Sequence, residues 1–419
     1  MPLPFSRNSA AARPTFSRDF AGVKTLDHGV GPAITFTRAD ATTCATFFDA
    51  NGVLQLAAAN VPRFDHDPAT AGNPSRGLLI EEARTNLLVR SAEFTDASWA
   101  KTNVTASDGQ AAPDGTTNAD GIFETATTGI HETRQSVSIA ATATHTYSVF
   151  LKANGRNFAT VYVRETANSG ATYVSVVVDL SNGSISGSPV GTATVTSVGN
   201  GWYRVAVSAS IDAGTRFAQI RLREDASTTS YAGDITKGIL AWGAQLEAGA
   251  FPTSYIPTTS AAATRAADSA AVTSISSFYN QAEGTLFAEA SVYARKNPGA
   301  QDVYSFAIAQ TNRIGIRYVN ANISAGIAVA DTSTFGFGVT GSVNIVYKTA
   351  LAYAVDNSAA SINGSDATTD TDVILPSILT GMFIGRRSGT ATDFLNGHIR
   401  RIAYWPRRLS NSLLQQLTV

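Results

Sequence analysis

The chain has 419 residues, of which 15% are charged, and its formal net charge at pH 7 is −1. This length is enough for two or three domains, and the near-neutral net charge provides no global field that would favour nucleic acid or a membrane surface. Cys44 is the only cysteine, which excludes an intrachain disulfide. No apolar run reaches the ~20 residues that span a bilayer. We therefore expect no nucleic-acid partner and no membrane insertion.

Residues 1–90 contain short strand-like runs interrupted by turns. The run at 33–38 alternates apolar and polar residues, and residues 49–52 form a turn of the Asn-Gly kind. The beginning of the chain lacks the apolar segment of a secretory signal peptide, so we expect synthesis and assembly in a cytoplasm. No independent core is apparent in this region. We expect an extended attachment segment that buries apolar surface against another chain.

Residues 91–257 show a regular succession of strands and turns. Strands are predicted at 145–152, 158–165, 172–180, 202–210, 216–224 and 238–246. Closely spaced strands without intervening helices favour a β-sandwich over repeated β-α-β units. We expect this region to be a jelly roll.

Residues 258–271 are rich in Ala, Thr and Ser and predict a linker. The region 272–419 returns to strands, predicted at 284–294, 303–309, 313–319 and 344–355. Ser410 is placed to cap a short C-terminal helix that carries Leu413, Leu414 and Leu417 on one face. The predicted fold is all-β: two jelly-roll sandwiches preceded by an extended segment, with residues 272–419 folding independently.

A candidate ligand surface follows from the alternation of three strands in the first sandwich. Successive side chains on a strand point to opposite faces, and one face of each of these strands is apolar. The opposite faces carry aromatic rings, arginines and an amide, which are the groups that hold the faces and hydroxyls of sugars. The candidate glycan-binding residues are Tyr162, Arg164, Tyr173, Gln219, Arg221 and Arg223. A subunit interface or an ordinary solvated sheet are the alternatives.

The sequence offers little support for catalysis or for a metal site. Glu81 and Glu82 are adjacent and would face opposite ways on a strand, which makes them a poor acid and base pair. Residues 65–68 predict a turn, and no nucleophile elbow or phosphate loop is present. The acidic stretch 366–372 lacks the glycine and distal glutamate of an EF-hand loop. We expect no enzyme activity, no catalytic residues, no metal and no cofactor.

Several stretches resemble modular virion proteins of tailed bacteriophages and prophages. They are FDHDP at 64–68 followed by GLLIEEARTNL at 77–87, GWYRV at 201–205, and AWGAQLE at 241–247 followed by SYIPT at 254–258. Such proteins commonly carry a jelly roll like those of carbohydrate-binding modules. The stretches FIGR at 383–386 and LNGHIRRIAYW at 395–405 resemble the end of a laminin-G-like, concanavalin-A-type sandwich.

This resemblance implies a fibre or spike protein displayed on a virion, with other virion proteins and a host-surface glycan as its partners. Residues 1–90 would attach the chain, and the two sandwiches would bind polysaccharide during adsorption. We expect a homo-oligomer, with a trimer as the first choice and a pentamer as the alternative. The rival interpretations are a capsule-degrading spike enzyme and a purely structural decoration protein.

Overall fold

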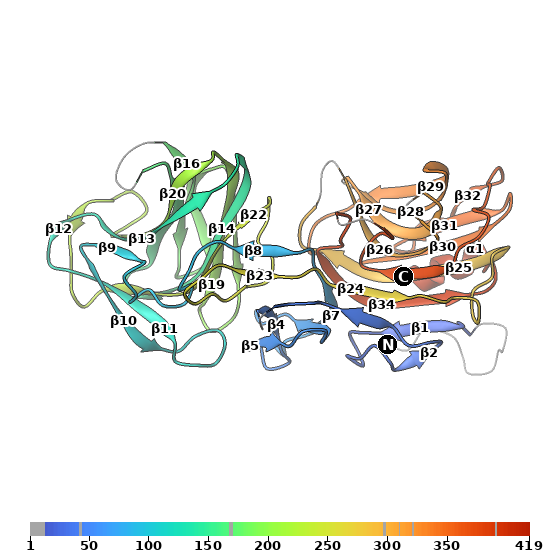
Figure 1. Ribbon diagram of the computed structural model, residues 1–419, viewed down its shortest axis with the longest axis horizontal. Helices are drawn as coiled ribbons and strands as arrows, with labels where there is room; N and C mark the ends of the chain where they lie inside the picture. The colour runs from blue at the N-terminus through green and yellow to red at the C-terminus, as the bar shows by residue number, and fades with distance from the viewer. Residues whose placement is uncertain are drawn as a thin grey trace.

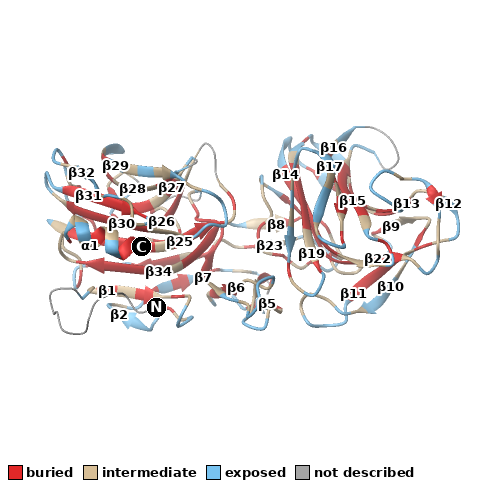
Figure 2. Ribbon diagram, turned by 180° about the vertical axis from the view of Figure 1, so that it is seen from behind, coloured by how far each residue is buried: buried red, intermediate tan, exposed pale blue. Residues whose placement is uncertain are grey.

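The computed structural model describes residues 13–419 except 42–43, 167–170, 296–298, 310, 321 and 390–391. Within these residues the chain forms two β-sandwich lobes joined side by side (Figure 1). One helix occurs in the described part, α1 (Asn411–Thr418), and the prediction of an all-β fold is confirmed. In both lobes the interior strands are buried, while the outer loops are exposed (Figure 2).

The first sandwich contains two antiparallel six-stranded sheets. One sheet has the order β10 (Val104–Gln110), β11 (Ala119–Glu124), β22 (Gly238–Ala248), β14 (Ala143–Asn154), β19 (Tyr203–Ile211) and β18 (Thr192–Ser197). The other has the order β17 (Ser184–Val190), β16 (Thr172–Asp179), β15 (Phe158–Arg164), β20 (Gly214–Arg223), β13 (His131–Ile139) and β9 (Ala100–Thr102). A small ribbon, β12 (Thr128–Gly129) with β21 (Tyr231–Ala232), lies beside them. Alternate Val, Ile and Leu residues of the facing sheets fill the core between them.

The second sandwich is built from one nine-stranded and one seven-stranded sheet. The first contains β2 (Gly29–Val30), β1 (Phe16–Asp19), β34 (Gly397–Trp405), β25 (Glu283–Val292), β30 (Tyr347–Ala354), β31 (Ser358–Ile362) and β32 (Thr368–Asp370), with β7 (Ser75–Ile80) paired to β34 and β6 (Arg63–His66) paired to β7. The second has the order β29 (Thr332–Thr340), β28 (Asn322–Val329), β27 (Arg313–Val319), β26 (Ala300–Ala307), β33 (Gly381–Ile384), β24 (Ser269–Val272) and β3 (Thr35–Thr37). The described part of residues 1–90 therefore supplies strands to both sheets.

The expectation of a coreless attachment segment needs correction at this point. β1 and β7 pair with β34, and β3 pairs with β24, so both sheets of the second sandwich contain N-terminal strands. Phe16, Leu78 and Ile80 are fully buried in the core of that sandwich. The short strands could not form a core of their own, and they bury their apolar residues against strands that lie more than 180 residues later in this same chain. The segment is thus part of the second lobe.

The predicted linker is also structured. Its residues include β23 (Ala263–Arg265), which pairs with β8 (Arg84–Asn86) to form a two-stranded connection between the lobes, visible in Figure 1. The next strand, β24, already belongs to the second sandwich. The hairpin of β4 (Ala45–Phe48) and β5 (Leu54–Ala57) lies below this connection. Its Leu54 packs in the cluster that contains Trp202 and Trp242 of the first sandwich.

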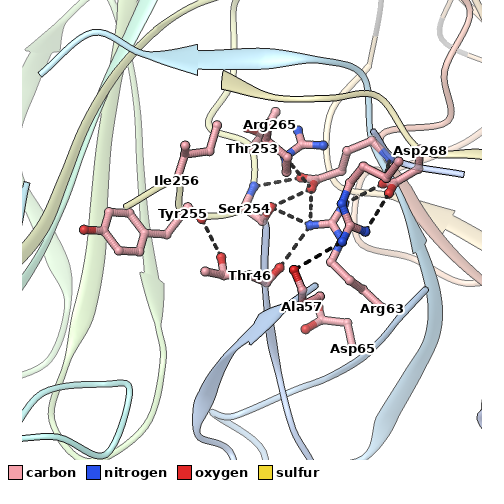
Figure 3. Close-up of polar contacts among 12 residues, drawn as sticks. Thr46, Ala57, Arg63, Asp65, Thr253, Ser254, Tyr255, Ile256, Arg265 and Asp268 are labelled. Atoms are coloured by element: carbon pink, nitrogen blue, oxygen red, sulfur yellow. Dashed lines mark hydrogen bonds and ion pairs between the residues drawn. The ribbon is translucent and has the colours of Figure 1, made fainter. Parts of the chain in front are cut away.

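A buried ionic network joins the two lobes (Figure 3). The Arg63 guanidinium lies 2.8 Å from Oε2 of Glu81 and 2.5 Å from Oδ2 of Asp268, and all three side chains have at most 1% exposure. Ser254, which follows the last strand of the first sandwich, donates its hydroxyl to Glu81 at 2.6 Å and accepts from Arg63 at 2.7 Å. Because buried charges must be paired, this network fixes the chain segments that cross between the lobes.

The C-terminal helix forms as predicted. The Ser410 side chain accepts a hydrogen bond from the backbone N–H of Leu413, which caps the first turn. Leu414 and Leu417 are buried against Trp405 and the alanines of β30 and β31. The helix therefore covers the outer face of the nine-stranded sheet.

Candidate functional site

A hollow of about 160 Å³ lies on the outer face of the sheet that contains β15, β16 and β20. Its lining is entirely polar or aromatic, and three of its seven residues are arginines. The lining residues are Thr160, Tyr162, Arg164, Thr172, Ser175, Arg221 and Arg223. We call this hollow the arginine pocket.

Strand register explains why these residues meet. Tyr162 of β15 lies opposite Ser175 of β16 on one side and Gln219 of β20 on the other. Two residues before Tyr162 on β15, Thr160 lies opposite Arg221 of β20. The intervening residues Val161 and Ile220 point into the core and are fully buried. The alternation that fills the core therefore places the polar set on the outer face.

Glu132 of β13 organises one wall of the pocket. Its carboxylate has no exposure and accepts from the Tyr162 hydroxyl at 2.5 Å and from Nε and Nη2 of Arg221 at 3.0 and 2.8 Å. Arg134 approaches its other oxygen at 3.3 Å. Burial, together with the neighbouring carboxylate charge, raises the pKa of Tyr162, so this phenol stays protonated as a donor.

The other two arginines differ from Arg221 in their partners. Arg223 donates Nη1 to the hydroxyl of Thr160 at 3.1 Å, and its remaining hydrogen bonds go to the carbonyls of Asp225 and Ala226. Arg164 has no carboxylate within ion-pair distance among the residues that the structure describes, and its Nε is buried without an acceptor. These two cations therefore lack a paired counter-charge in the pocket.

The six candidate residues predicted from the sequence have different environments. Tyr162, Arg164, Arg221 and Arg223 line the arginine pocket. Gln219 belongs to the same strand face but is completely buried. Tyr173 lies outside the lining, where its hydroxyl bonds Asp212 and its ring contacts the Arg216 guanidinium.

The predicted stacking role of Tyr162 needs correction. Its side chain is only 4% exposed. The guanidinium carbons of Arg221 and Arg164 lie 5.3 and 5.9 Å from its ring centroid. Arginines already occupy the surroundings of the ring, so it supports them and does not provide an open platform for a sugar.

Sequence reasoning missed Glu132 and the hydroxyl-bearing residues Thr160, Thr172 and Ser175. Glu132 belongs to β13, which was not among the predicted strands, and its importance depends on the pairing of β13 with β20. Alternation along β15 does place Thr160 on the same face as Tyr162, so this residue could have been found.

The carboxylates considered for catalysis have structural partners. Glu81 belongs to the network between the lobes, and Asp65 accepts from the backbone of Phe48 and from His398 Nε2 at 2.8 Å. Asp65 lies in β6 and not in the predicted turn. Within the described residues, no group of three or more potential metal ligands is found. None of the helical residues described forms a stretch that is both long and apolar enough to cross a membrane.

Comparisons with known proteins give distant structural similarities. No protein-family model matches the chain, and no curated protein sequence is significantly similar to it. Among solved structures, the CBM40 domain of the Ruminococcus gnavus IT-sialidase bound to sialyllactose matches with 16% identity over 33% of this chain and 85% of that chain, at a TM-score of 0.28.

Two further solved structures, a sialidase and a laminin fragment, are also similar to this chain. The Trypanosoma rangeli sialidase in complex with the inhibitor DANA has 14% identity over 36% of this chain and 25% of that chain, with a TM-score of 0.28. Domains LG4-5 of the mouse laminin α1 chain have 10% identity over 67% of this chain and 88% of that chain, with a TM-score of 0.24. The match thus spans a quarter of the sialidase. Because all three TM-scores are low, the description of two sandwiches rests on the strand pairing of this chain.

Proposed function

We propose that this chain is a non-enzymatic appendage protein of a tailed-phage-like particle and that it binds host-surface polysaccharide through the arginine pocket. The observation that carries the proposal is the gathering of three arginines and four hydroxyl-bearing side chains, including Tyr162, in one small hollow. Guanidinium groups and hydroxyls are suited to the polar rim of a sugar ring.

The size of the pocket limits what it holds. Pockets for drug-sized ligands usually measure about 300–1,000 Å³, whereas the arginine pocket measures about 160 Å³. A single sugar residue, either a terminus or a side branch of a polysaccharide, suits this space. Repetition of one weak site in a homo-oligomer, such as a trimer, would then supply avidity on a repetitive surface.

The chemistry of the pocket favours binding over cleavage. Glu132 is the carboxylate that bonds the lining residues, but it is buried and accepts from Tyr162, Arg221 and Arg134. Glycoside hydrolysis commonly needs two carboxyl groups that reach the scissile bond. A carboxylate held by three donors is a poor candidate for either role.

The virion assignment rests on the resemblance of residues 64–87, 201–205 and 241–258 to phage proteins. The described N-terminal strands are part of the second lobe, so attachment to other virion proteins would use the outer surface of that lobe or residues 1–12. Labelled antibodies against the chain, applied to particles released from a producing culture, should decorate an appendage in electron micrographs. Labelling of the cells but never of particles would refute the virion assignment.

A single incubation experiment distinguishes binding of a polysaccharide from its cleavage. The purified chain is mixed with surface polysaccharides from a panel of bacteria, and both retention on the polymer and new reducing ends are measured. We expect retention without shortening of the polymer. New reducing or unsaturated ends would identify the chain as a capsule-degrading enzyme, and a lack of retention on every polymer would favour a purely structural component.

A further inference from the structure

Positive charge exceeds negative charge at the arginine pocket. Arg164, Arg221 and Arg223 all line it, whereas Glu132 ion-pairs only with Arg221 among them. Arg134, which is not among the lining residues, shares the same carboxylate. The charge of Asp225 acts on Arg223, but the Asp225 carboxylate accepts hydrogen bonds from Ser227 and Thr228 of its own loop.

The groups of the pocket itself compensate its positive charge only in part. Burial, and next the positive charge of Arg221, lower the pKa of Arg223, while the charge of Asp225 acts in the opposite direction. The Nε of Arg164 is buried without an acceptor. A buried donor without an acceptor is unfavourable, and a bound oxyanion would compensate the excess positive charge of the pocket.

We propose that the arginine pocket binds the carboxylate of an acidic sugar residue, with Arg164 and Arg223 as its contacting cations. This inference rests on the proposed function and specifies its ligand class. Planar guanidinium groups bind oxyanions through paired, charge-assisted hydrogen bonds. The hydroxyls of Thr172 and Ser175, which line the same hollow, are available to the sugar ring.

Glu132 acts as a positioning residue in this proposal. By accepting two hydrogen bonds from Arg221 and one from Tyr162, it holds that arginine against the ring on one side of the pocket. The buried carboxylate thus fixes Arg221 on that side of the pocket.

The test compares acidic polymers with neutral polymers of the same backbone. The full chain is passed over immobilised hyaluronan, alginate and polygalacturonate, and over the carboxyl-reduced form of each. We expect at least one acidic polymer to bind at least tenfold more tightly than its reduced form. Arg164→Gln should weaken that binding at least tenfold, and Arg164→Lys should weaken it less because the charge remains.

Arg216→Gln is the matched control, because Arg216 lies on the neighbouring strand β20, is partly exposed and is absent from the pocket lining. It should bind like the unmodified chain. Melting temperatures of all variants show whether the fold is intact. Inorganic phosphate is titrated as a separate probe, since a free anion has the same charge chemistry without a sugar.

Each outcome has a distinct meaning. Equal binding of acidic and reduced polymers overturns the acidic-ligand inference but leaves glycan binding in place. Saturation by phosphate that depends on Arg164, with no polymer retained, supports an anion site and overturns the glycan function. Binding of neither polymers nor phosphate, or polymer binding that Arg164→Gln does not change, overturns the assignment of this pocket.

Discussion

Replacing Arg63 by alanine should destabilise the second sandwich and its junction with the first. Arg63 has no exposure, and it lies between Glu81 and Asp268 at 2.8 and 2.5 Å. Its removal would leave two buried carboxylates with excess negative charge. Breaking a buried ion pair by removing one partner costs about 3–5 kcal/mol.

The remaining partners place the expected loss at the lower end of that range. Asp268 keeps Arg38 at 3.2 Å, and Glu81 keeps Arg265 at 3.6 Å. We therefore expect Arg63→Ala to lower the free energy of unfolding by about 3 kcal/mol. Urea titration followed by tryptophan fluorescence reports on both lobes, because Trp405 lies in the second sandwich and Trp202 lies in the first.

Arg76→Ala provides the matched control. Arg76 pairs with Asp67 at 3.1 Å, but the two side chains are 38% and 25% exposed. An ion pair of this kind contributes at most about 1 kcal/mol. If Arg63→Ala lowered the unfolding free energy no more than Arg76→Ala does, the conclusion that this network stabilises the junction would be wrong.

Three other outcomes are expected. Residues 272–419 expressed alone should lack a fixed tertiary structure, because β1, β3 and β7 are absent from their sheets; a soluble monomer with a native near-ultraviolet circular dichroism spectrum would contradict this. Glu132→Ala should lower the free energy of unfolding by about 3 kcal/mol, since Arg221 loses its counter-charge. Urea titration measures this loss, and a loss no larger than the roughly 0.5 kcal/mol that is usual for surface substitutions would contradict the prediction. Burial raises the pKa of Asp120 from 3.8 to about 6, so the folded state favours the protonated acid and the contribution of Asp120 to the melting temperature should fall as the pH rises from 4 to 6. Asp120→Asn should reduce this fall, and equal pH profiles for both proteins would count against the assignment.

The strand pattern of the first sandwich could be predicted from local sequence. In the run at 172–180, Val174, Val176 and Val178 alternate with Tyr173, Ser175 and Asp179 on the opposite face, and the structure has β16 at Thr172–Asp179. The same alternation placed Tyr162, Arg164, Arg221 and Arg223 on one face, and all four line the arginine pocket. Side-chain alternation is a property of each strand by itself, so neighbouring residues are enough to reveal it.

Sequence reasoning could not determine which strands pair or which polar groups become buried. Phe16 pairs with Tyr404 across the whole length of the chain, and no local pattern in residues 1–90 specifies that partner. From the sequence, Tyr162 is expected to be an exposed aromatic residue. In the structure, the pairing of β13 with β20 places Glu132 within hydrogen-bond distance of its hydroxyl. Which strands pair depends on the side chains that distant segments of the chain contribute to the same sheet. Whether a polar side chain is buried depends on which other strand comes to lie beside it. Residue alternation therefore determined the polar face, whereas the tertiary structure decided that this face is an arginine pocket supported by a buried carboxylate.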